Sequence, residues 1–280
     1  MKIRLLPLAV AILMLAYVVE VHAQDADANP LGPGEAGTKI FLGPCLGYNS
    51  VSHSTAKLAT FAGDRYCPSF EGGTGQGFYV GLTYEHHLGK KKEESTSSII
   101  GRLIYSMYPG SMKQVGDKFP SLIPVDDAID PSGVSITDSE TEHTVDITYN
   151  VLSLEVMFKQ NLSLDVPLGF TAGPTFEYPI QKQVLQEYNI LSPPDVKFAK
   201  VDKYDYKNND RTVIVKDGDI DNASPIRIGI KFGLQYEIII GEGYYIVPAV
   251  FYNWSLLNVK TDETYRINAF QVGVDIRFAL

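Results

Sequence analysis

Residues 225–240 read PIRIGIKFGLQYEIII, and the strict alternation of this stretch decides the fold class. From Ile226 to Tyr236 every second side chain is apolar, whereas the positions between them hold arginine, lysine, glutamine or glycine. A period of two indicates a β-strand with two different faces, because successive side chains point to opposite sides. A membrane-spanning strand needs about 9–11 residues, whereas the average globular strand has about five or six. The length of this stretch therefore favours a membrane.

Two further segments, 165–178 and 265–280, repeat this design. Five others alternate less cleanly on the same plan, and they are 38–51, 77–88, 98–108, 144–158 and 244–256. The connections alternate between long and short until a last loop of moderate length, and they are 52–76, 89–97, 109–143, 159–164, 179–224, 241–243 and 257–264. Outer-membrane barrels have this rhythm of long outer loops and short periplasmic turns. We therefore predict an all-β fold, a closed eight-stranded antiparallel up-and-down transmembrane β-barrel.

The polar face of these segments decides which side meets lipid, because periodicity alone does not. Its charged residues are Glu85, Arg102, Glu155, Glu177, Arg227, Lys231, Glu237, Asp275 and Arg277. Repeated glycines lie between them, which suits a narrow interior in which carboxylates meet cationic groups. We therefore predict that these charges line the lumen and that the apolar face points to lipid. The alternative is a soluble barrel that turns the charged face to water.

The N-terminus predicts export. Lys2 and Arg4 precede a short apolar run that ends at a small-residue cleavage site after Ala23. The expected organisation is a signal peptide at 1–23, a flexible linker at 24–37 and the barrel domain at 38–280. An uncleaved membrane anchor is the alternative reading of the apolar run. The formal net charge of −9 makes nucleic acid a poor partner.

Two cysteines, Cys45 and Cys67, fit an oxidising compartment. Cys45 falls in the first expected strand and Cys67 in the loop that follows it. A disulfide between them would hold that loop against the barrel. Two free thiols are the alternative.

The C-terminal segment carries the most specific motif of the chain. Gln271, Gly273, Ile276 and Phe278 occupy the specified positions of the β-signal that the bacterial barrel-assembly machinery reads, although Ala279 and Leu280 extend past the terminal aromatic residue. We therefore expect the assembly machinery and outer-membrane lipids as partners, and the bacterial outer membrane as the location.

With this signal, residues 38–280 resemble the PorT-like outer-membrane β-barrels of Bacteroidota, and more distantly the small barrels of the OmpA and OmpX type. The resemblance rests on the strand-to-loop rhythm, the start of a strand at 165–168, the glycine-rich segment 72–82 and the β-signal. It implies an integral outer-membrane barrel. Members of the family share no single activity, so it implies no catalytic or binding residue.

No other motif predicts chemistry. His86 and His87 beside Glu85 are neighbours on a strand, so they face opposite sides and do not readily share one metal ion. The acidic stretch 217–222 begins like a calcium loop but lacks the glycine at position six and the glutamate at position twelve. We expect no enzyme activity, no cofactor and no metal.

The function that the sequence favours is a non-enzymatic structural, adhesive or secretion-accessory role in the outer membrane. A narrow porin-like channel is the first alternative. A lipid A-modifying enzyme with a Ser–His–acid site is a weaker one, for which His53 and His143 lie near the outer strand ends among Ser and Thr residues. A soluble lipocalin-like carrier is the last.

Overall fold

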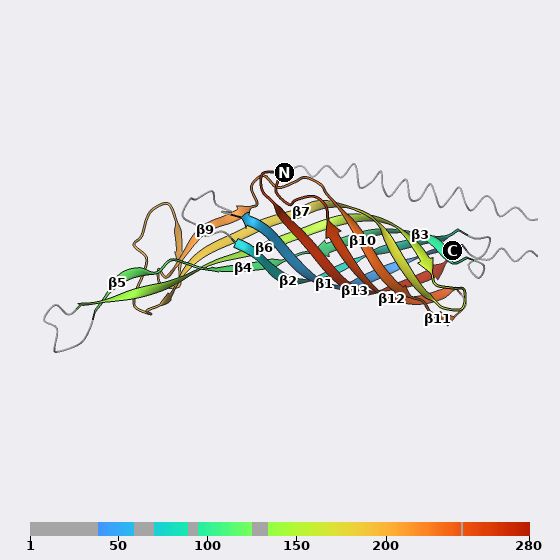
Figure 1. Cartoon of the computed structure of the whole chain (residues 1–280), viewed down its shortest axis with the longest axis horizontal. Coiled ribbons are helices and arrows are strands. Elements are labelled where there is room, and N and C mark those ends of the chain that lie inside the picture. Colours follow the sequence, from blue (N-terminus) through green and yellow to red (C-terminus); the bar gives the residue numbers. More distant parts are fainter. Residues whose placement is uncertain (1–38, 59–69, 89–94, 125–133, 242) are drawn as a thin grey trace, which may run out of the picture. The chain divides into compact units, whose positions relative to one another are not determined.

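The computed structural model describes residues 39–58, 70–88, 95–124, 134–241 and 243–280. This part of the chain folds into antiparallel strands (Figure 1). They are β1 (Ile40–Leu58), β2 (Phe70–His87), β3 (Ser97–Met107), β4 (Gly110–Val115), β5 (Phe119–Pro124), β6 (Val134–Asn161), β7 (Leu168–Ser192), β8 (Asp205–Lys207), β9 (Thr212–Asp219), β10 (Arg227–Tyr236), β11 (Ile238–Gly241), β12 (Tyr244–Ser255) and β13 (Tyr265–Ala279). None of the described residues forms a helix long and apolar enough to cross a membrane.

Eight strands close into a ring, which confirms the predicted fold. Each is hydrogen-bonded to the next in the order β1, β2, β3, β6, β7, β10, β12 and β13. The ring closes where β13 pairs with β1, from Phe41 opposite Ala279 to Thr55 opposite Tyr265. Closure leaves no open sheet edge in the ring, as a barrel in lipid requires.

The long connections 109–143 and 179–224 are not loops, which corrects the prediction for them. The first contains β4, β5 and the beginning of β6, and the second contains the end of β7 together with β8 and β9. β6 has 28 residues and spans roughly 90 Å at about 3.3 Å per residue. Several strands of the ring therefore continue past it as a projecting sheet, with β5 farthest from the ring (Figure 1).

The same strands serve both regions because the hydropathy of their two faces is exchanged where lipid ends. Within the ring, Leu154 and Phe158 of β6 face outward and Glu155 is buried inside. Farther along the same strand, Asp146 is exposed and Ile147 is buried on the lumen side. A strand outside the membrane has water on its outer face, so its apolar side chains turn inward, as in a soluble sheet. The level of this change marks the outer surface of the membrane.

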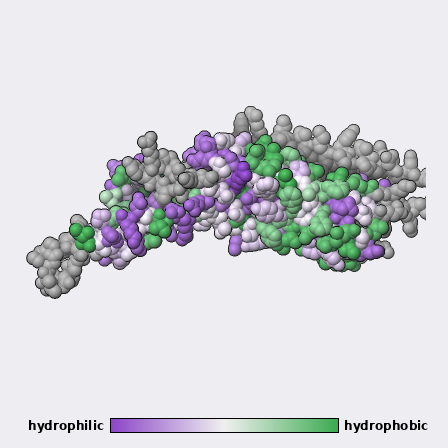
Figure 2. All heavy atoms as spheres, viewed as in Figure 1, coloured by the Kyte–Doolittle hydropathy of each residue, from purple (hydrophilic) through white to green (hydrophobic). Residues whose placement is uncertain are grey.

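An apolar belt surrounds the ring. Figure 2 shows hydrophobic side chains gathered over the barrel strands and hydrophilic ones over the projecting strands. The exposed belt residues are Leu46, Phe78, Val80, Leu82, Leu154, Val156, Phe158, Phe170, Phe176, Tyr178, Phe232, Leu234, Tyr236, Val250, Tyr252, Trp254, Phe270, Val272, Ile276 and Phe278. A soluble barrel would not leave so large an apolar area in water. The chain is a membrane-spanning β-barrel.

Candidate functional site: a charged lumen, an apolar plug and a projecting wall

The lumen of the ring holds all nine charges that the sequence assigns to it. Each is less than a tenth exposed, and Asp275 is 0% exposed. A tenth charge, Lys159, is 1% exposed and lies among them. It lies one residue beyond the expected end of its strand, and continuing the alternation past Phe158 would have found it.

One continuous chain of ion pairs runs through the lumen. It begins at Lys159, whose Nζ lies 2.7 Å from Glu85 Oε1 and also pairs with Glu237. Arg277 pairs with Glu85 as well, and its Nη2 lies 2.9 Å from Asp275 Oδ2. These charges link β2, β6, β13 and the residue after β10, so the network joins strands from opposite sides of the ring.

The chain of ion pairs continues toward the outer side through Arg102. Its guanidinium lies 3.6 Å from Asp275 and 3.3 Å from Glu155, and Lys231 pairs with the same Glu155. Separately, Arg227 Nη1 lies 3.3 Å from Glu177 Oε2. These five cations and five anions balance, so the ten lumen charges have no net sign. Such balance matters because an unpaired buried charge is strongly destabilising.

Glycines on the lumen face give room to one aromatic ring. Gly47 lies opposite both Tyr79 and Gly273 in the neighbouring strands. A Cβ added at Gly47 would lie 2.4 Å from Tyr79 Cε1, and one added at Gly273 would lie 2.0 Å from Tyr79 Oη. The Tyr79 ring therefore covers both backbones, where any side chain would collide with it.

An apolar plug fills the interior at the outer end of the ring. Its buried residues are Val51, Phe70, Tyr108, Met112, Val145, Ile147, Tyr149, Val151, Val184, Ile220, Val259, Tyr265, Ile267 and Ala269. Two of them come from connections, Ile220 after β9 and Val259 after β12. These connections meet where the Ser224 amide donates to the Val259 carbonyl at 2.7 Å. The plug therefore combines strands and connections in one core.

His53 is a buried polar member of this region. It lies beyond the apolar belt, because its neighbours Ser52 and Ser54 are exposed to the outside of the barrel. Its Nδ1 is 2.6 Å from Tyr265 Oη and its Nε2 is 3.0 Å from the Pro109 carbonyl oxygen. Burial lowers the pKa of His53 to about 4, although the hydrogen bond with the Pro109 carbonyl raises it. The imidazole is therefore neutral at pH 7.

The other sequence candidates lie apart from one another. His87 faces the lumen with Nε2 3.7 Å from Glu85 Oε1, whereas His86 lies near the Tyr84 hydroxyl, 3.5 Å away. In the acidic stretch 217–222, Asp221 pairs with Lys216. No group of three or more metal-ligating side chains occurs within the described ranges.

Cys45 is buried in the lumen wall. The proposed disulfide involves Cys67, which lies outside the described residues, as do the expected signal peptide and linker.

The residues of the β-signal all lie on β13, where the ring closes. Gln271 faces the lumen and donates to Asn49 Oδ1 at 2.7 Å across the β1–β13 seam. Ile276 and Phe278 face outward, and the Phe278 ring packs edge-on against Tyr244 with a centroid distance of 5.6 Å. The motif therefore contributes to both faces of the last strand.

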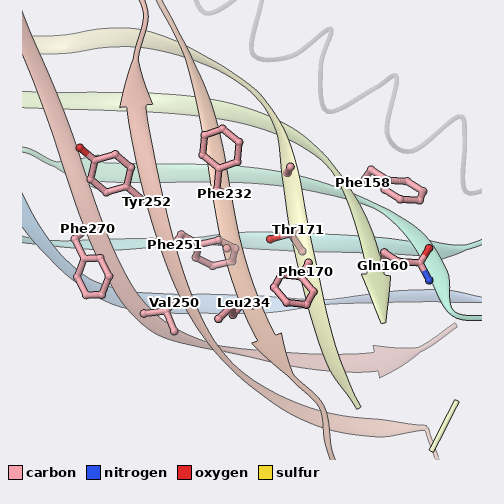
Figure 3. A pocket seen from close by; sticks show the side chains of 12 residues that line it. Phe158, Gln160, Phe170, Thr171, Phe232, Leu234, Val250, Phe251, Tyr252 and Phe270 are labelled. Atoms are coloured by element: carbon pink, nitrogen blue, oxygen red, sulfur yellow. The ribbon is translucent and has the colours of Figure 1, made fainter. Parts of the chain in front are cut away.

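A groove of about 550 Å³ lies on the belt rather than in the lumen (Figure 3). It forms because the small Ala172 lies directly between Phe158 and Phe232 on neighbouring strands. Phe170 and Tyr252 extend the apolar lining. The groove belongs to the lipid-facing surface and contains none of the lumen charges.

The projecting wall is built from β4, β6, β7, β8 and β9. Between β6 and β7 the His143 and Tyr188 rings stack with centroids 4.0 Å apart, and Phe198 packs on Tyr188 at 5.1 Å. Burial lowers the pKa of His143, opposed by the Asp117 carboxylate, which raises it. Ion pairs such as Lys207–Glu187, 3.1 Å apart, lie on the exposed side. The wall is thus an ordered, two-faced sheet outside the membrane.

Comparisons with solved structures find bacterial barrels at low similarity. Neisserial surface protein A is 9% identical with a TM-score of 0.34, over 86% of this chain and 97% of that one. Ail of Yersinia pestis, solved with the heparin analogue sucrose octasulfate, is 8% identical with a TM-score of 0.30, over 86% and 99%. The translocator domain of autotransporter NalP from Neisseria meningitidis is 12% identical with a TM-score of 0.28, over 95% and 98%.

Similarities of this size do not establish a fold, which is defined here by the strand pairing of the ring. No protein-family model matches the chain, and no curated protein matches it. Its closed ring, apolar belt and charged lumen are those of an outer-membrane-type β-barrel.

Proposed function

We propose that the chain is a non-enzymatic adhesin of a bacterial outer membrane, which displays its projecting wall to the outside. The observation that carries this proposal is that β6 and β7, with 28 and 25 residues, continue far past the apolar belt as an ordered sheet. A barrel that served only as a membrane anchor has no need of such strands, since about 9–11 residues cross the bilayer. Outer connections on a rigid scaffold are where binding concentrates.

The filled interior of the barrel favours a function at its outer surface over transport through its lumen. Ten buried, paired charges and an apolar plug occupy the space that a pore would need. We therefore propose that the barrel does not conduct, that its partners in the membrane are lipids and, during insertion, the assembly machinery, and that it has no cofactor. Membership in the PorT-like family is part of the same proposal, supported by the β-signal at 271–278.

Adherence of cells tests the proposal. The full chain is produced in a Gram-negative host without surface adhesins, and attachment to abiotic surfaces, to host-cell layers and to other bacteria is counted. A shortened variant replaces 117–140 by Asn-Gly, because the Gly116 amide already donates to the Thr141 carbonyl at 2.8 Å and can close a hairpin there. We expect adherence from the full chain and a loss of it in the variant.

The result that would overturn the proposal is equal adherence of producing and non-producing cells. Two further measurements address the alternatives. Purified protein in planar bilayers should give no discrete conductance steps, and lipid A from producing cells should keep its acyl profile. Conductance steps would support the channel, and an altered profile would support the enzyme.

A further inference from the structure

β5 and the first residues of β6 form a two-stranded ribbon beyond the end of β7 (Figure 1). β5 pairs with β6 from Val134 to Ser139, whereas β7 pairs with β6 only from Glu140 onward. Within the described residues, no strand pairs with either outer edge of this ribbon. An open edge presents unpaired N–H and C=O groups that can accept another strand.

The outer edge of β5 is blocked by prolines. The Gly116 amide donates to the Thr141 carbonyl, so the backbone groups of Thr141 and of every second residue before it point toward β4 and β5. Ser139 lies opposite Phe119 and Asp138 lies opposite Pro120. By this alternation the first pair is a hydrogen-bonded pair and the second is a non-hydrogen-bonded pair. Pro120 and Pro124 occupy the positions whose backbone nitrogens point to the open side. Because proline has no N–H, this edge offers little to a second strand.

The outer edge of β6 is not blocked. By the same alternation Val134, Ile136 and Asp138 point their N–H and C=O groups away from β5. Each of them has a backbone N–H, since none is proline. The Ile136 side chain is 72% exposed, so it is free to contact a second strand at this edge. The ribbon therefore has one protected edge and one edge with complete hydrogen-bonding groups and an exposed apolar residue.

We propose that this edge pairs antiparallel with the same edge of a second copy, centred on Ile136. The proposal rests on the adhesive function and names its partner. About the two-fold axis, Ile136 lies opposite Ile136 of the second copy, and Asp138 lies opposite Val134. No acidic residues face each other, and the three pairs exchange about six N–H···O bonds. The surface is self-complementary, as a two-fold interface requires.

The antiparallel arrangement sets the positions of the two barrels. The paired β6 strands run in opposite directions, so their barrels lie at opposite ends of the joined ribbons. Two copies therefore bridge two membranes rather than sit side by side in one. One such contact is small, and many copies on two facing surfaces add their affinities. The inferred activity is homotypic contact between cells.

Charge exchange at the two-fold axis tests the pairing and its register. Two populations of producing cells carry different fluorescent labels, one with Ile136→Lys and the other with Ile136→Glu. Each population alone places like charges opposite each other and should not clump. A mixture of the two should clump again, with both colours in every aggregate. Wild-type cells that do not clump, or a mixture that stays dispersed, would overturn the proposal.

A pair of proline variants separates pairing from folding. Ile136→Pro removes a donor from the open edge of β6 and leaves the bonds between β5 and β6 intact, so it should abolish clumping. Leu122→Pro makes the equivalent change on the already blocked edge and should clump as wild type. Heat-modifiable gel migration checks that both barrels are folded. Clumping of Ile136→Pro cells at the wild-type level would contradict the proposal.

A cross-linking measurement on purified protein in detergent gives a second readout. With both native cysteines replaced by serine, Ile136→Cys should form a disulfide-linked dimer, because opposed residues lie about 5.5 Å apart between Cα atoms. Asp138→Cys should not, since position 138 lies opposite position 134. Cross-linking of both variants alike would contradict the register. Cells that adhere to other surfaces but never clump would leave the adhesive function standing and remove only the homotypic pairing.

Discussion

Lys159 completes the charge balance of the lumen. Without it the predicted set contains five carboxylates and four cations, and with it the numbers are equal. Its ammonium group pairs with Glu85 and Glu237. In a buried ion pair the cost of removing both charges from water offsets much of their mutual attraction. A buried charge that has lost its partner is strongly destabilising. Balance is therefore a condition for folding this barrel.

Removing Lys159 should be strongly destabilising. We expect Lys159→Met to lower the free energy of unfolding by about 3–5 kcal/mol, the usual cost of breaking a buried ion pair from one side. The measurement is urea unfolding in lipid vesicles, followed by heat-modifiable gel migration. The double variant Lys159→Met with Glu237→Gln should recover part of the loss, because the second change removes a carboxylate left without its cation. A single variant as stable as wild type would contradict the paired lumen.

His53 should make stability depend on pH. Its pKa is about 4 in the folded protein and about 6.5 in the unfolded chain. The unfolded state therefore binds the proton more readily, so the stability from the neutral imidazole is complete above pH 6.5 and declines as the pH falls toward 4. The loss attributable to this group reaches about 3 kcal/mol.

The comparison that isolates this effect is wild type against His53→Gln. Carboxylates also titrate in this range, so the difference between the two pH profiles is the quantity to measure. We expect the profiles to converge as the pH falls from 7 to 4. Parallel profiles would show that His53 is not held in its neutral form.

At the scale of the strand, the phase change of the alternation separates membrane from exterior. β6 crosses this boundary between Thr148, which is exposed among polar residues, and Leu154, which is 51% exposed within the belt. The same strand therefore offers two outward positions in different solvents.

A lysine at each position should report that difference. Leu154→Lys should cost about 2–4 kcal/mol of folding free energy, the range for a cation on the lipid face near the bilayer midplane. Thr148→Lys should change it by less than about 0.5 kcal/mol, as at an ordinary surface site. Unfolding in vesicles measures both. Equal costs would place the boundary elsewhere.

The strands of the ring could be predicted from the sequence, because their outward positions in the membrane are mostly apolar and many of their inward positions are polar, charged or glycine. The projecting strands could not, since the pattern there reverses its sense and is diluted by polar residues on the water side. At Leu154 and Glu155 the outward residue is apolar and the inward residue is charged. At Asp146 and Ile147 the outward residue is charged and the inward residue is apolar. A prediction that assumes an apolar outward face along the whole strand therefore ends the strand where the outward face becomes polar.

The lumen charges could be predicted individually, but their partners could not. Arg277 and Glu85 are far apart in the sequence, and the ring brings them together. The apolar plug also depends on closure, because Ile220 and Val259 enter it from connections whose paths the periodicity does not specify.

At the scale of the whole molecule, three layers follow one another along the strands. The belt with its balanced lumen lies in lipid, the apolar plug fills the outer end of the ring, and the wall stands in water. Each layer places its apolar side chains away from the water nearest to it. The single physical condition behind all three is the solvent that each face of a strand meets.

The only tryptophan of the chain tests this condition without any substitution. Trp254 faces outward on β12 and is 45% exposed. In vesicles containing phospholipids brominated on their acyl chains, its fluorescence should be strongly quenched and its emission should lie at short wavelength. Unquenched emission at the wavelength of a water-exposed indole would mean that the apolar face does not meet lipid, and the membrane-spanning barrel would be wrong.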